Sequence, residues 1–402
     1  MSSLLVAVSG GSDSIALMHL ASRWAAQRGL VCSVITIDHD LRTESAREAI
    51  FVKLAAGALG LEHKTVRWKG GNNKGNLQRC ARKARYDLIG ENRGRHNIVL
   101  TGHTLDDQAE TFLLRLRRGS GVDGLAAMPA KRKITGKNGG FWLLRPMLEL
   151  TRDKIKNFLV RQKISWVEDP SNEDSKFDRI VIRKVIQQLS DLGITAFLLS
   201  NTATHMRRAR TALDLQAGRM AQQICSTHMG DLVIDRRGFS DMHAEIKFRL
   251  FARGLRWVSS NPYNPRFNAL VAIMERVLTG KAQTLHGCYI FPETEHIRIS
   301  REFNAVSKIR IPLRNNTLWD GRWKLQSLDQ HCNSFCQVAA LGPEGARWVR
   351  ERTNTVIPYQ SLQSHPGIYD NKGLRYAPSL ITNSAIGATF CASPFSEAFR
   401  AY

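Results

Sequence analysis

An α/β fold is predicted by two patterns in the sequence, with a doubly wound, mostly parallel sheet and helices on both faces. Strand-like and helix-like segments alternate over residues 1–120, which indicates parallel strands joined by helical crossovers. An uninterrupted apolar run over residues 4–8 is typical of a buried strand. A helical linker and a small α+β, β-rich C-terminal part are expected to follow this sheet.

The first strand and helix are predicted from the pattern around a glycine turn. After the apolar run, Ile15, Met18 and Ala21 repeat at helical spacing, and Gly29 lies where a C-cap glycine would end the helix. The segments that follow alternate in the same way. Strands are expected at 31–38, 64–68 and 97–102, and helices at 44–59, 76–91 and 105–118.

Beyond residue 118 the predicted elements are less regular. Residues 119–145 are rich in glycine and basic side chains and are expected to form a loop. A helix is predicted over residues 151–162, with Thr151 as its N-cap. The later segments are expected to be largely helical, then mixed, then built of short strands: 180–225, 226–305 and 306–402. Three domains are predicted: 1–190, 191–305 and 306–402.

The chain is strongly basic, with a formal net charge of +23 and an isoelectric point near 10.2 over 402 residues. The basic excess extends over both halves of the chain, so it is not a detachable tail. Such an excess predicts a polyanionic partner, because lysine and arginine side chains neutralise phosphates along a nucleic acid. An RNA is therefore an expected partner.

The cysteine pattern and the hydropathy predict a cytoplasmic protein. Seven cysteines are scattered along the chain without a Cys-x-x-Cys pair, which is typical of a reducing compartment. No apolar stretch reaches the length of about 18 residues that a membrane helix needs. Met1-Ser2-Ser3 leads directly into the first strand, so neither a membrane segment nor a targeting segment is expected.

A predicted phosphate-binding turn follows the first strand: Ser9, Gly10, Gly11, Ser12, Asp13 and Ser14. Glycines let the backbone close around oxygens, and N–H groups at a helix start point toward an anion. The serine hydroxyls add donors, and Asp13 can hold Mg²⁺ on the phosphates. The signatures of a Walker A loop and of a dinucleotide-binding turn are both missing from this segment.

Acidic side chains crowd the start of the helix predicted at 105–118. Asp106 and Asp107 lie four and three residues before Glu110, so the three carboxylates share one end of the helix. This end follows a strand, where ligands bind in parallel sheets. The acids can hold Mg²⁺ or receive a cationic substrate, and both interpretations stay open at this point. His103 stands just before them and is a candidate for orienting them.

Basic side chains repeat on the helix predicted at 76–91. Arg79, Arg82 and Arg85 are three residues apart and share one face. A bound anion, or the carboxylates of the site, would offset their mutual repulsion. A solvated basic face explains the pattern equally well, so both interpretations stay open.

Seven motifs occur in order and together resemble the bacterial tRNA(Ile)-lysidine synthetases, a family of pyrophosphate-loop ATPases. They are the turn at 9–14, then Asp38–Arg42, Ala81–Tyr86, Gly102–Thr111, Arg117–Leu125, Arg145-Pro146 and Glu168–Asn172. The motifs fall within residues 4–185, under half of the chain. The resemblance implies an adenine nucleotide alpha hydrolase-like fold for this part.

The resemblance implies a two-step ligase reaction. ATP adenylates the C2 carbonyl oxygen of the wobble cytidine, position 34 in the CAU anticodon of tRNA(Ile), and releases pyrophosphate. The ε-amine of L-lysine then displaces AMP and gives lysidine. ATP, Mg²⁺, L-lysine and this tRNA are the implied substrates and cofactors. A homodimer is also expected, and the segment 191–305 is expected to bind tRNA.

The resemblance also implies roles for single residues. Arg82 handles the substrate during catalysis. Asp107 and Glu110 bind lysine, and together with Asp13 they complete the catalytic set. Contacts with the tRNA substrate are implied for four arginines: Arg42, Arg85, Arg179 and Arg183.

The chain departs from the family pattern at two positions. Ile180 stands where the family usually has Asn, and Lys184 stands where it usually has His. The side-chain contacts of that Asn and that His are therefore not expected in this protein.

Three other functions compete with this interpretation. A pyrophosphate-loop tRNA 2-thiolase would need sulfur-carrying or cluster-binding cysteines, and only Cys32 and Cys80 lie in the first 190 residues. A small-molecule synthetase or amidotransferase would not need the basic charge. A non-enzymatic RNA-binding protein would not need the intact acidic cluster.

Overall fold

The computed structural model describes residues 3–38, 44–68, 77–134, 139–168, 178–327, 336–381 and 386–399. The chain forms two compact units, Met1–Arg210 with Tyr402 and Thr211–Ala401, which are called unit 1 and unit 2 below. Helix α8 (Ala196–Ile224) contains the boundary between them. Among the described residues, no helix is both long enough and apolar enough to cross a membrane.

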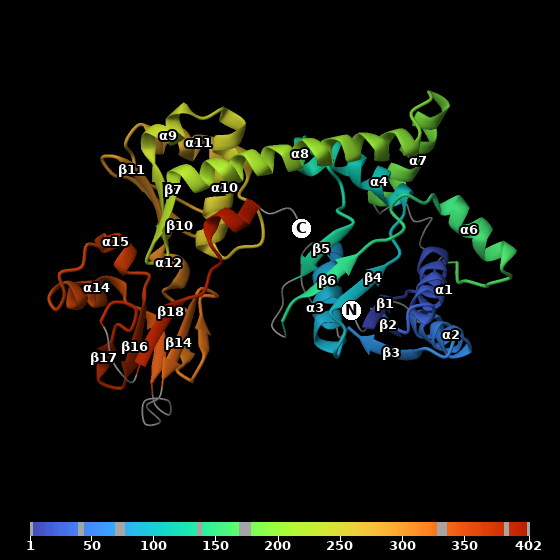
Figure 1. Cartoon of the computed structure of the whole chain (residues 1–402), viewed down its shortest axis with the longest axis horizontal. Coiled ribbons are helices and arrows are strands. Elements are labelled where there is room, and N and C mark those ends of the chain that lie inside the picture. Colours follow the sequence, from blue (N-terminus) through green and yellow to red (C-terminus); the bar gives the residue numbers. More distant parts are fainter. Residues whose placement is uncertain are drawn as a thin grey trace. The chain divides into compact units, whose positions relative to one another are not determined.

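Unit 1 is built on a six-stranded sheet in the order β3-β2-β1-β4-β6-β5 (Figure 1). Its strands are β1 (Ser3–Ala7), β2 (Val31–Asp38), β3 (Glu62–Arg67), β4 (Ile98–Thr101), β5 (Lys131–Ile134) and β6 (Phe141–Leu144). All neighbouring pairs are parallel except β5 with β6. The predicted mostly parallel α/β sheet is therefore confirmed.

The connections place β2 and β3 on one side of β1, and β4 on the other. Leu5 of β1 is in register with Ser33 of β2 and with Val99 of β4, so both neighbours run alongside the same short strand. Strand order reverses at this point, and open parallel sheets bind ligands beyond the carboxyl ends of the strands at such a reversal. The sheet therefore positions a site after Ala7 and Thr101.

Helices cover both faces of this sheet (Figure 1). They are α1 (Ser12–Ala26), α2 (Glu44–Ala58), α3 (Leu77–Asn92) and α6 (Arg152–Arg161), whereas α4 (Leu105–Leu116) follows β4 and packs outside these two faces. Leu4 and Val6 pack in one core with residues of α1, α2 and α6, whereas Leu5 packs in a second core with Ile89 of α3. Alternate side chains of β1 thus point to opposite faces, as a doubly wound sheet requires.

Residues 119–145 form more structure than the loop expected from the sequence. The segment contains α5 (Val122–Leu125) and the strands β5 and β6. Phe141 and Leu143 alternate with less buried neighbours and fill the core on the α3 face, because β6 pairs parallel to β4. β5 lies at the sheet edge, and its three basic residues are exposed. β5 and β6 have only four residues each and lie near several glycines, so their alternation of buried and exposed residues is too short to predict a strand from the sequence.

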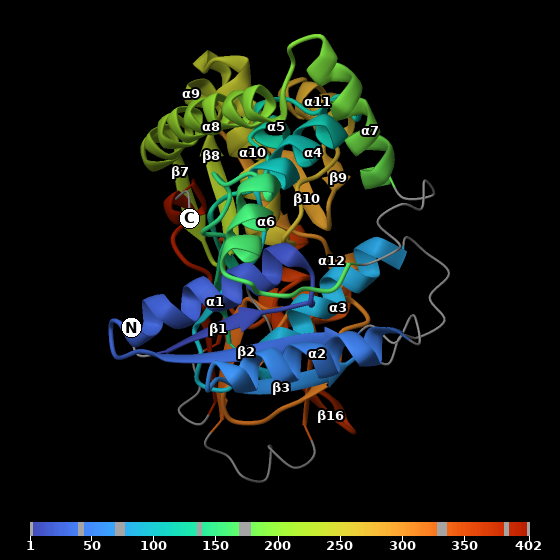
Figure 2. The same cartoon turned by 90° about the vertical axis from the view of Figure 1, so that its right-hand side faces the viewer.

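Two further helices complete the described part of unit 1. They are α7 (Asp178–Asp191) and the first part of α8. Helix α7 lies beside α4 (Figure 2), and Ile182 packs with Phe112 and Leu199 in a shared apolar core. The helix predicted at 151–162 is confirmed as α6, and the Thr151 hydroxyl accepts a hydrogen bond from the Lys154 backbone N–H at 3.3 Å.

Unit 2 contains three antiparallel sheets and several helices. The first sheet has the order β7-β8-β11-β10-β9 and consists of Cys225–His228, Asp231–Asp235, His296–Arg301, Cys288–Pro292 and Gln283–Leu285. It shares an apolar core with α10 (Ala244–Ser259) and α11 (Phe267–Leu278), and α9 (Arg236–Asp241) contributes Phe239.

The two smaller sheets lie later in the chain. One has the order β12-β15-β16-β17, formed by Ile311–Pro312, Gln337–Ala340, Pro366–Asp370 and Gly373–Tyr376. The other has the order β13-β14-β18, formed by Thr317–Trp319, Trp323–Ser327 and Ile386–Phe390. The helical elements are α12 (Phe303–Val306), α14 (Gly342–Arg350), α15 (Tyr359–Leu362) and η2 (Phe395–Phe399). A β-rich end is therefore confirmed, while the boundaries at 190 and 305 stay predictions.

Candidate active site

The predicted phosphate-binding turn lies between β1 and α1. Gly10 has a φ of +93°, a conformation that L side chains rarely adopt, so glycine is required there. Gly11 is the N-cap of α1, and the first turn is closed by hydrogen bonds from the backbone N–H groups of Ser14 and Ile15 to the Gly11 carbonyl, at 3.1 and 3.0 Å. No side chain caps this helix start, which leaves the positive end of α1 to an anion.

The serine hydroxyls of the turn hold its shape. The Ser14 hydroxyl donates to the Gly11 carbonyl at 2.9 Å and accepts from the Ser9 backbone N–H at 3.1 Å. The Ser9 and Ser14 hydroxyls are 3.3 Å apart, and the Ser12 hydroxyl donates to Asp13 Oδ1 at 3.4 Å. The turn is thus preformed, with hydroxyl and backbone donors around one helix start.

Gly102, at the end of β4, lies directly against the first turn of α1. A Cβ atom added to Gly102 would lie 2.9 Å from the Asp13 carbonyl oxygen and 3.1 Å from Ser14 Cα. Only glycine permits this backbone approach, because real Cβ atoms do not come so close to backbone atoms. The contact brings the acidic start of α4 next to the phosphate-binding turn.

The start of α4 is a capping box. The Thr104 backbone N–H donates to Asp107 Oδ2 at 2.9 Å, and the Asp107 backbone N–H donates to the Thr104 hydroxyl at 3.4 Å. The Thr104 hydroxyl also donates to Asp107 Oδ2, at 3.2 Å. One oxygen of Asp107 therefore stabilises the helix end, and the other, Oδ1, faces the site.

Arg152, which the sequence analysis did not single out, lies at the centre of the acidic side chains. Its Nε is 3.3 Å from Asp13 Oδ2, and its two terminal nitrogens are 3.6 Å from Asp107 Oδ1 and 3.8 Å from Glu110 Oε1. Its backbone N–H donates to Asp106 Oδ2 at 2.7 Å. An arginine in the first turn of a helix is unfavourable for the helix dipole, and that anomaly was a signal in the sequence.

Glu110 is the most deeply buried carboxylate of the site, with 1 % of its surface exposed. Arg183 Nε donates to Glu110 Oε1 at 2.6 Å, which joins α7 to α4. Glu110 Oε2 is buried without a hydrogen-bond partner among the described residues. A buried carboxylate oxygen with no partner is a place where a ligand donor fits.

The electrostatics of the site favour an added cation. Burial raises the pKa of Asp13, and the neighbouring carboxylates of Asp107 and Asp106 add to this, while Arg152 opposes it. Burial and Asp107 also raise the pKa of Glu110, against the opposing effect of Arg183.

The balance of charges points the same way. Burial by itself lowers the pKa of Arg152, but the carboxylates of Asp107, Asp13 and Glu110 raise it overall. Asp13, Asp106, Asp107 and Glu110 face two guanidinium groups, so negative charge remains to be compensated.

Magnesium was predicted at Asp13, and the residues fit that ion in part. Mg²⁺ usually takes one or two protein carboxylates and completes its shell with water and phosphate oxygens. Asp13 at the phosphate-binding turn meets that need once a polyphosphate is bound. Within the described ranges, no group of three or more His, Cys, Asp or Glu side chains is arranged to hold a metal by itself.

The remaining predicted residues are placed as follows. Arg42 lies outside the described residues, and so does the side chain of Arg82, whose backbone belongs to α3. Arg85, on the same helix, is exposed. Arg179 is half-buried on α7, one helical turn before Arg183, which contacts Glu110. His103 shares a hydrogen bond of 3.1 Å with the Thr101 hydroxyl.

The two departures from the family pattern have clear local settings. Ile180 is 7 % exposed, so an apolar side chain suits its position on α7. Lys184 is exposed on the same helix and adds to the basic surface. Neither residue forms part of the contacts around Glu110 described above.

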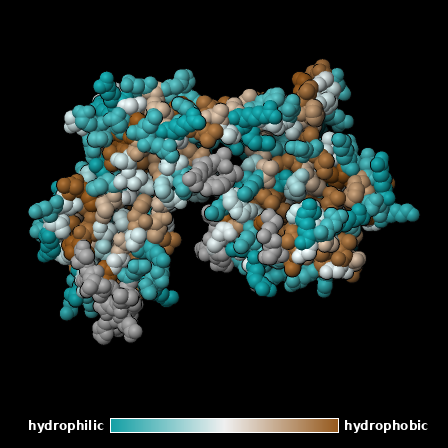
Figure 3. Space-filling view, in the orientation of Figure 1, coloured by the Kyte–Doolittle hydropathy of each residue, from teal (hydrophilic) through white to brown (hydrophobic). Residues whose placement is uncertain are grey.

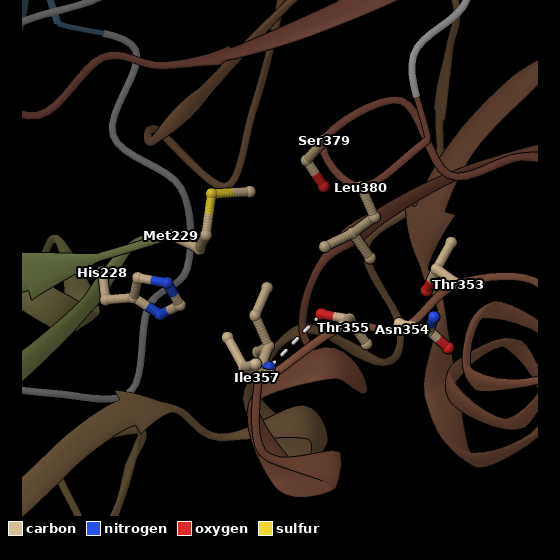
Figure 4. Close-up of a pocket in the computed structure, with 9 residues that line it drawn as sticks. His228, Met229, Thr353, Asn354, Thr355, Ile357, Ser379 and Leu380 are labelled. Carbon is tan, nitrogen blue, oxygen red and sulfur yellow. Dashed lines mark hydrogen bonds between the residues drawn. The ribbon is translucent and has the colours of Figure 1, made fainter.

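A separate pocket of about 390 Å³ lies in unit 2 (Figure 4). His228 and Met229 line one side, and Thr353, Thr355 and Ser379 lie across from them. The Ile357 backbone N–H donates to the Thr355 hydroxyl at 3.2 Å. The pocket is lined by one imidazole together with hydroxyl, amide and apolar groups, so it lacks the carboxylates and guanidinium groups of the acidic site in unit 1.

Comparisons with known proteins identify the family of the chain. Residues 1–189 match the family model of the PP-loop domain. The tRNA(Ile)-lysidine synthase of Ruegeria pomeroyi is 40 % identical over 93 % of this chain and 87 % of its own length. That of Wolbachia pipientis wMel is 38 % identical over 83 % of this chain and 78 % of its own length.

One solved structure shows a more distant likeness. The U34-tRNA thiolase NcsA from Methanococcus maripaludis, with its [4Fe-4S] cluster, is 15 % identical with a TM-score of 0.44, over 52 % of this chain and 72 % of that chain. The two synthase relatives, by contrast, cover most of this sequence at close to 40 % identity. By its fold, its phosphate-binding turn and these relatives, the chain belongs to the tRNA(Ile)-lysidine synthase family.

Proposed function

We propose that this protein is an ATP-dependent ligase that joins L-lysine to C2 of the wobble cytidine of tRNA(Ile). The observation that carries the proposal is the buried acidic cluster directly beside the phosphate-binding turn. Asp13 belongs to the turn, and one guanidinium links it to Asp107 and Glu110. Such an arrangement suits a reaction between a phosphate-activated substrate and a cationic amino acid.

In the first step, the phosphates of ATP bind at the start of α1. The backbone N–H groups of the turn and the Ser12 hydroxyl face the polyphosphate, and Mg²⁺ would be held by Asp13. The C2 carbonyl oxygen of the cytidine attacks the α-phosphorus, a new O–P bond forms, and pyrophosphate leaves. Arg82 is proposed to stabilise the negative charge that develops on the α-phosphate.

In the second step, lysine binds between Asp107 and Glu110. Its ε-amine forms the new C–N bond at C2, and the C2–O bond to AMP breaks. The amine loses a proton in this step, and Glu110 is suited to accept it, because burial raises the pKa of this carboxyl above its ordinary value. Asp107 Oδ1 and the unpartnered Oε2 of Glu110 offer acceptors for the amine N–H groups.

The tRNA is proposed to bind along basic surfaces in both units. For unit 1, tRNA contacts are proposed for Arg42, Arg85 and Arg179, and Arg183 contacts Glu110. In the rest of the chain, residues 191–305 are proposed to form the main tRNA-binding domain, since the basic excess continues there. The basic surfaces would then hold the same tRNA molecule whose wobble cytidine reacts in the site.

We further propose a homodimer in the cytoplasm. Apolar side chains are exposed where α7 meets α8, a corner that is brown in Figure 3: Leu192 is 77 % exposed and Phe197 is 62 % exposed. A second copy would remove such side chains from water. Cys32, Cys225, Cys288 and Cys391 are free thiols, which suits a reducing compartment. Sedimentation of the wild type and of Phe197→Ser tests this; an unchanged monomer in both contradicts the dimer.

The rival thiolase function lacks support from the described cysteines. Burial raises the pKa of Cys32 to about 11, and Cys32 is buried in the sheet core, so its thiol is a poor nucleophile. The side chain of Cys80 lies outside the described residues. The described part of the catalytic unit therefore offers no reactive thiol.

One assay tests the proposed function directly. The full chain is incubated with ATP, labelled lysine and unmodified tRNA(Ile), and the nucleosides are then separated. Label in a modified cytidine, with release of AMP and pyrophosphate, is the expected result. Label in no nucleoside, or consumption of ATP that does not depend on the tRNA, contradicts the proposal. Glu110→Gln is the matched variant, and it should release pyrophosphate but incorporate little lysine.

A further inference from the structure

Arg152 connects the two halves of the site in a way that the family motifs do not describe. Its three guanidinium nitrogens face three carboxylates on two helices, Asp13 on α1 and Asp107 and Glu110 on α4. The distances of 3.3, 3.6 and 3.8 Å exceed the 2.7–2.9 Å typical of a tight charge-assisted hydrogen bond. The guanidinium is therefore shared among the three acids rather than fixed on one of them.

The backbone of Arg152 is held firmly, in contrast to its shared side chain. Its N–H donates to Asp106 Oδ2 at 2.7 Å, and the Leu105 N–H donates to the Leu150 carbonyl at 2.9 Å. These two hydrogen bonds join the start of α6 to the start of α4. The side chain can thus turn between the acids while its attachment point stays in place.

Arg183, the other guanidinium of the site, has a different position. Its Nε forms one short contact, 2.6 Å from Glu110 Oε1, and its ion pairs among the described residues do not include Asp13. Among the described residues, Arg152 is the cation that contacts both the phosphate-binding turn and the proposed lysine acids. A change at one end of the site therefore reaches the other end through Arg152.

We propose that Arg152 is a positioning residue that couples nucleotide binding to lysine binding. The proposal rests on the proposed function. Without nucleotide, the guanidinium competes with the substrate ammonium for Asp107 and Glu110. Phosphate oxygens at the start of α1 draw the guanidinium toward the turn, because guanidinium pairs well with phosphate. The two acids are then left to lysine, so each substrate strengthens the binding of the other.

Calorimetric titration of the full chain tests this coupling. L-Lysine is titrated with and without saturating α,β-methylene ATP, an analogue that is not cleaved between the α and β phosphates. For the wild type, the Kd for lysine is expected to fall at least about fivefold when the analogue is bound. For Arg152→Gln, the two Kd values are expected to be equal, and lysine should bind the free variant more tightly than it binds the free wild type.

Two further variants separate coupling from a purely structural role. Arg152→Lys keeps the charge but lacks the planar fork, so it should retain part of the coupling. Arg161→Gln makes the same change of charge at an exposed position in the last turn of α6, and it should couple as the wild type does. The reciprocal titration, in which the analogue is titrated with and without lysine, must give the same ratio in the wild type.

The outcomes distinguish the coupling from the proposed function. Lysine binding to the wild type that does not respond to the analogue overturns the coupling and leaves the lysine site intact. Full coupling in a folded Arg152→Gln variant, judged by circular dichroism, also overturns it. If that variant does not fold, the test still has two results: the ratio of the wild-type Kd values for lysine with and without the analogue, and the same ratio for Arg152→Lys. No lysine binding to the wild type in either condition overturns the proposed function, and the coupling with it.

Discussion

Arg152 and Asp13 are 139 residues apart in the sequence, yet Arg152 Nε lies 3.3 Å from Asp13 Oδ2. This contact joins the first helix of the sheet to the helix that follows its last strand. It also brings the anion-binding end of α1 to the same place as the acidic end of α4. The proposed phosphate site and the proposed amine site therefore meet at a single side chain, that of Arg152.

Asp107→Asn is expected to raise the KM for lysine at least about tenfold while the KM for ATP changes much less, because the variant removes one negative charge from the amine site. Asn still serves as a cap partner, so stability should change little. Thr104→Ala is the matched control; it removes the cap, lowers the free energy of unfolding by about 1 kcal/mol, and leaves the carboxylate in place. Steady-state kinetics and urea unfolding measure both effects. Equal increases in both KM values for Asp107→Asn would show the assignment to be wrong.

Gly102→Ala is expected to lower the free energy of unfolding by about 1–3 kcal/mol and to raise the KM for ATP. The added methyl group would lie 2.9 Å from the Asp13 carbonyl oxygen, so the first turn of α1 must move. Gly57→Ala is the control, since a Cβ there meets nothing within 4 Å and alanine is a better helix former than glycine in the last turn of α2. Thermal unfolding and the KM for ATP are measured for both variants. Wild-type behaviour of Gly102→Ala would contradict the close contact.

Arg183→Ala is expected to lower the free energy of unfolding by about 1–3 kcal/mol, because it leaves the buried Glu110 without its 2.6 Å partner. This loss of unfolding free energy is smaller than the loss expected for a fully buried ion pair, since the Arg183 side chain is 34 % exposed. Lys184→Ala, at the exposed neighbouring position, should stay within about 0.5 kcal/mol of the wild type. Equal effects of the two substitutions in urea unfolding would argue against a structural ion pair at Glu110.

The pH dependence of stability should reveal Glu110. Its pKa is raised above the ordinary value of 4.5, chiefly by burial, so the folded protein binds this proton more tightly than the unfolded chain does. The contribution of this group to the free energy of unfolding therefore falls as the pH rises from 4.5 through the raised pKa. Glu110→Gln lacks this titration and should gain stability relative to the wild type over that range, with a constant difference at lower pH. Urea unfolding across the range measures it. Glu168→Gln, at an exposed position, is the control and should not show this gain.

Binding of tRNA should weaken steeply with salt. If several lysines and arginines neutralise phosphates, affinity falls by more than about tenfold between 50 and 200 mM monovalent salt. Filter binding or fluorescence anisotropy with labelled tRNA gives the slope of log affinity against log salt. A flat line would mean that the basic excess does not form the RNA contact.

The sequence predicts those parts of the site whose structure depends on a few consecutive residues. The turn around Gly10 and Gly11 follows from its own residues, and so does the crowding of Asp107 and Glu110 at one helix end. The position of Arg152 at a helix start is visible in the sequence, but its role could not be predicted, because its partners lie on α1 and α4, far from it in the chain.

Other features escaped prediction for related reasons. The need for glycine at position 102 depends on how closely β4 approaches α1. β6 is only four residues long and is defined by pairing with β4, so the segment resembled a loop. The burial of Ile180 likewise reflects the packing of α7 and not its local pattern.

The exposed edge strand β5 has a consequence for the protein at high concentration. An open strand at the edge of a sheet is a template on which another chain can add its own strand and begin an aggregate. Lys131 and Lys133 stand on this edge, with their ammonium groups 4.0 and 5.9 Å from the ring centre of Trp142. The positive charge of these lysines repels the same edge strand of a second copy. Their side chains also cover the Trp142 ring, which would otherwise present apolar surface to that copy. The basic edge is thus expected to disfavour pairing of β5 with the same strand of another copy.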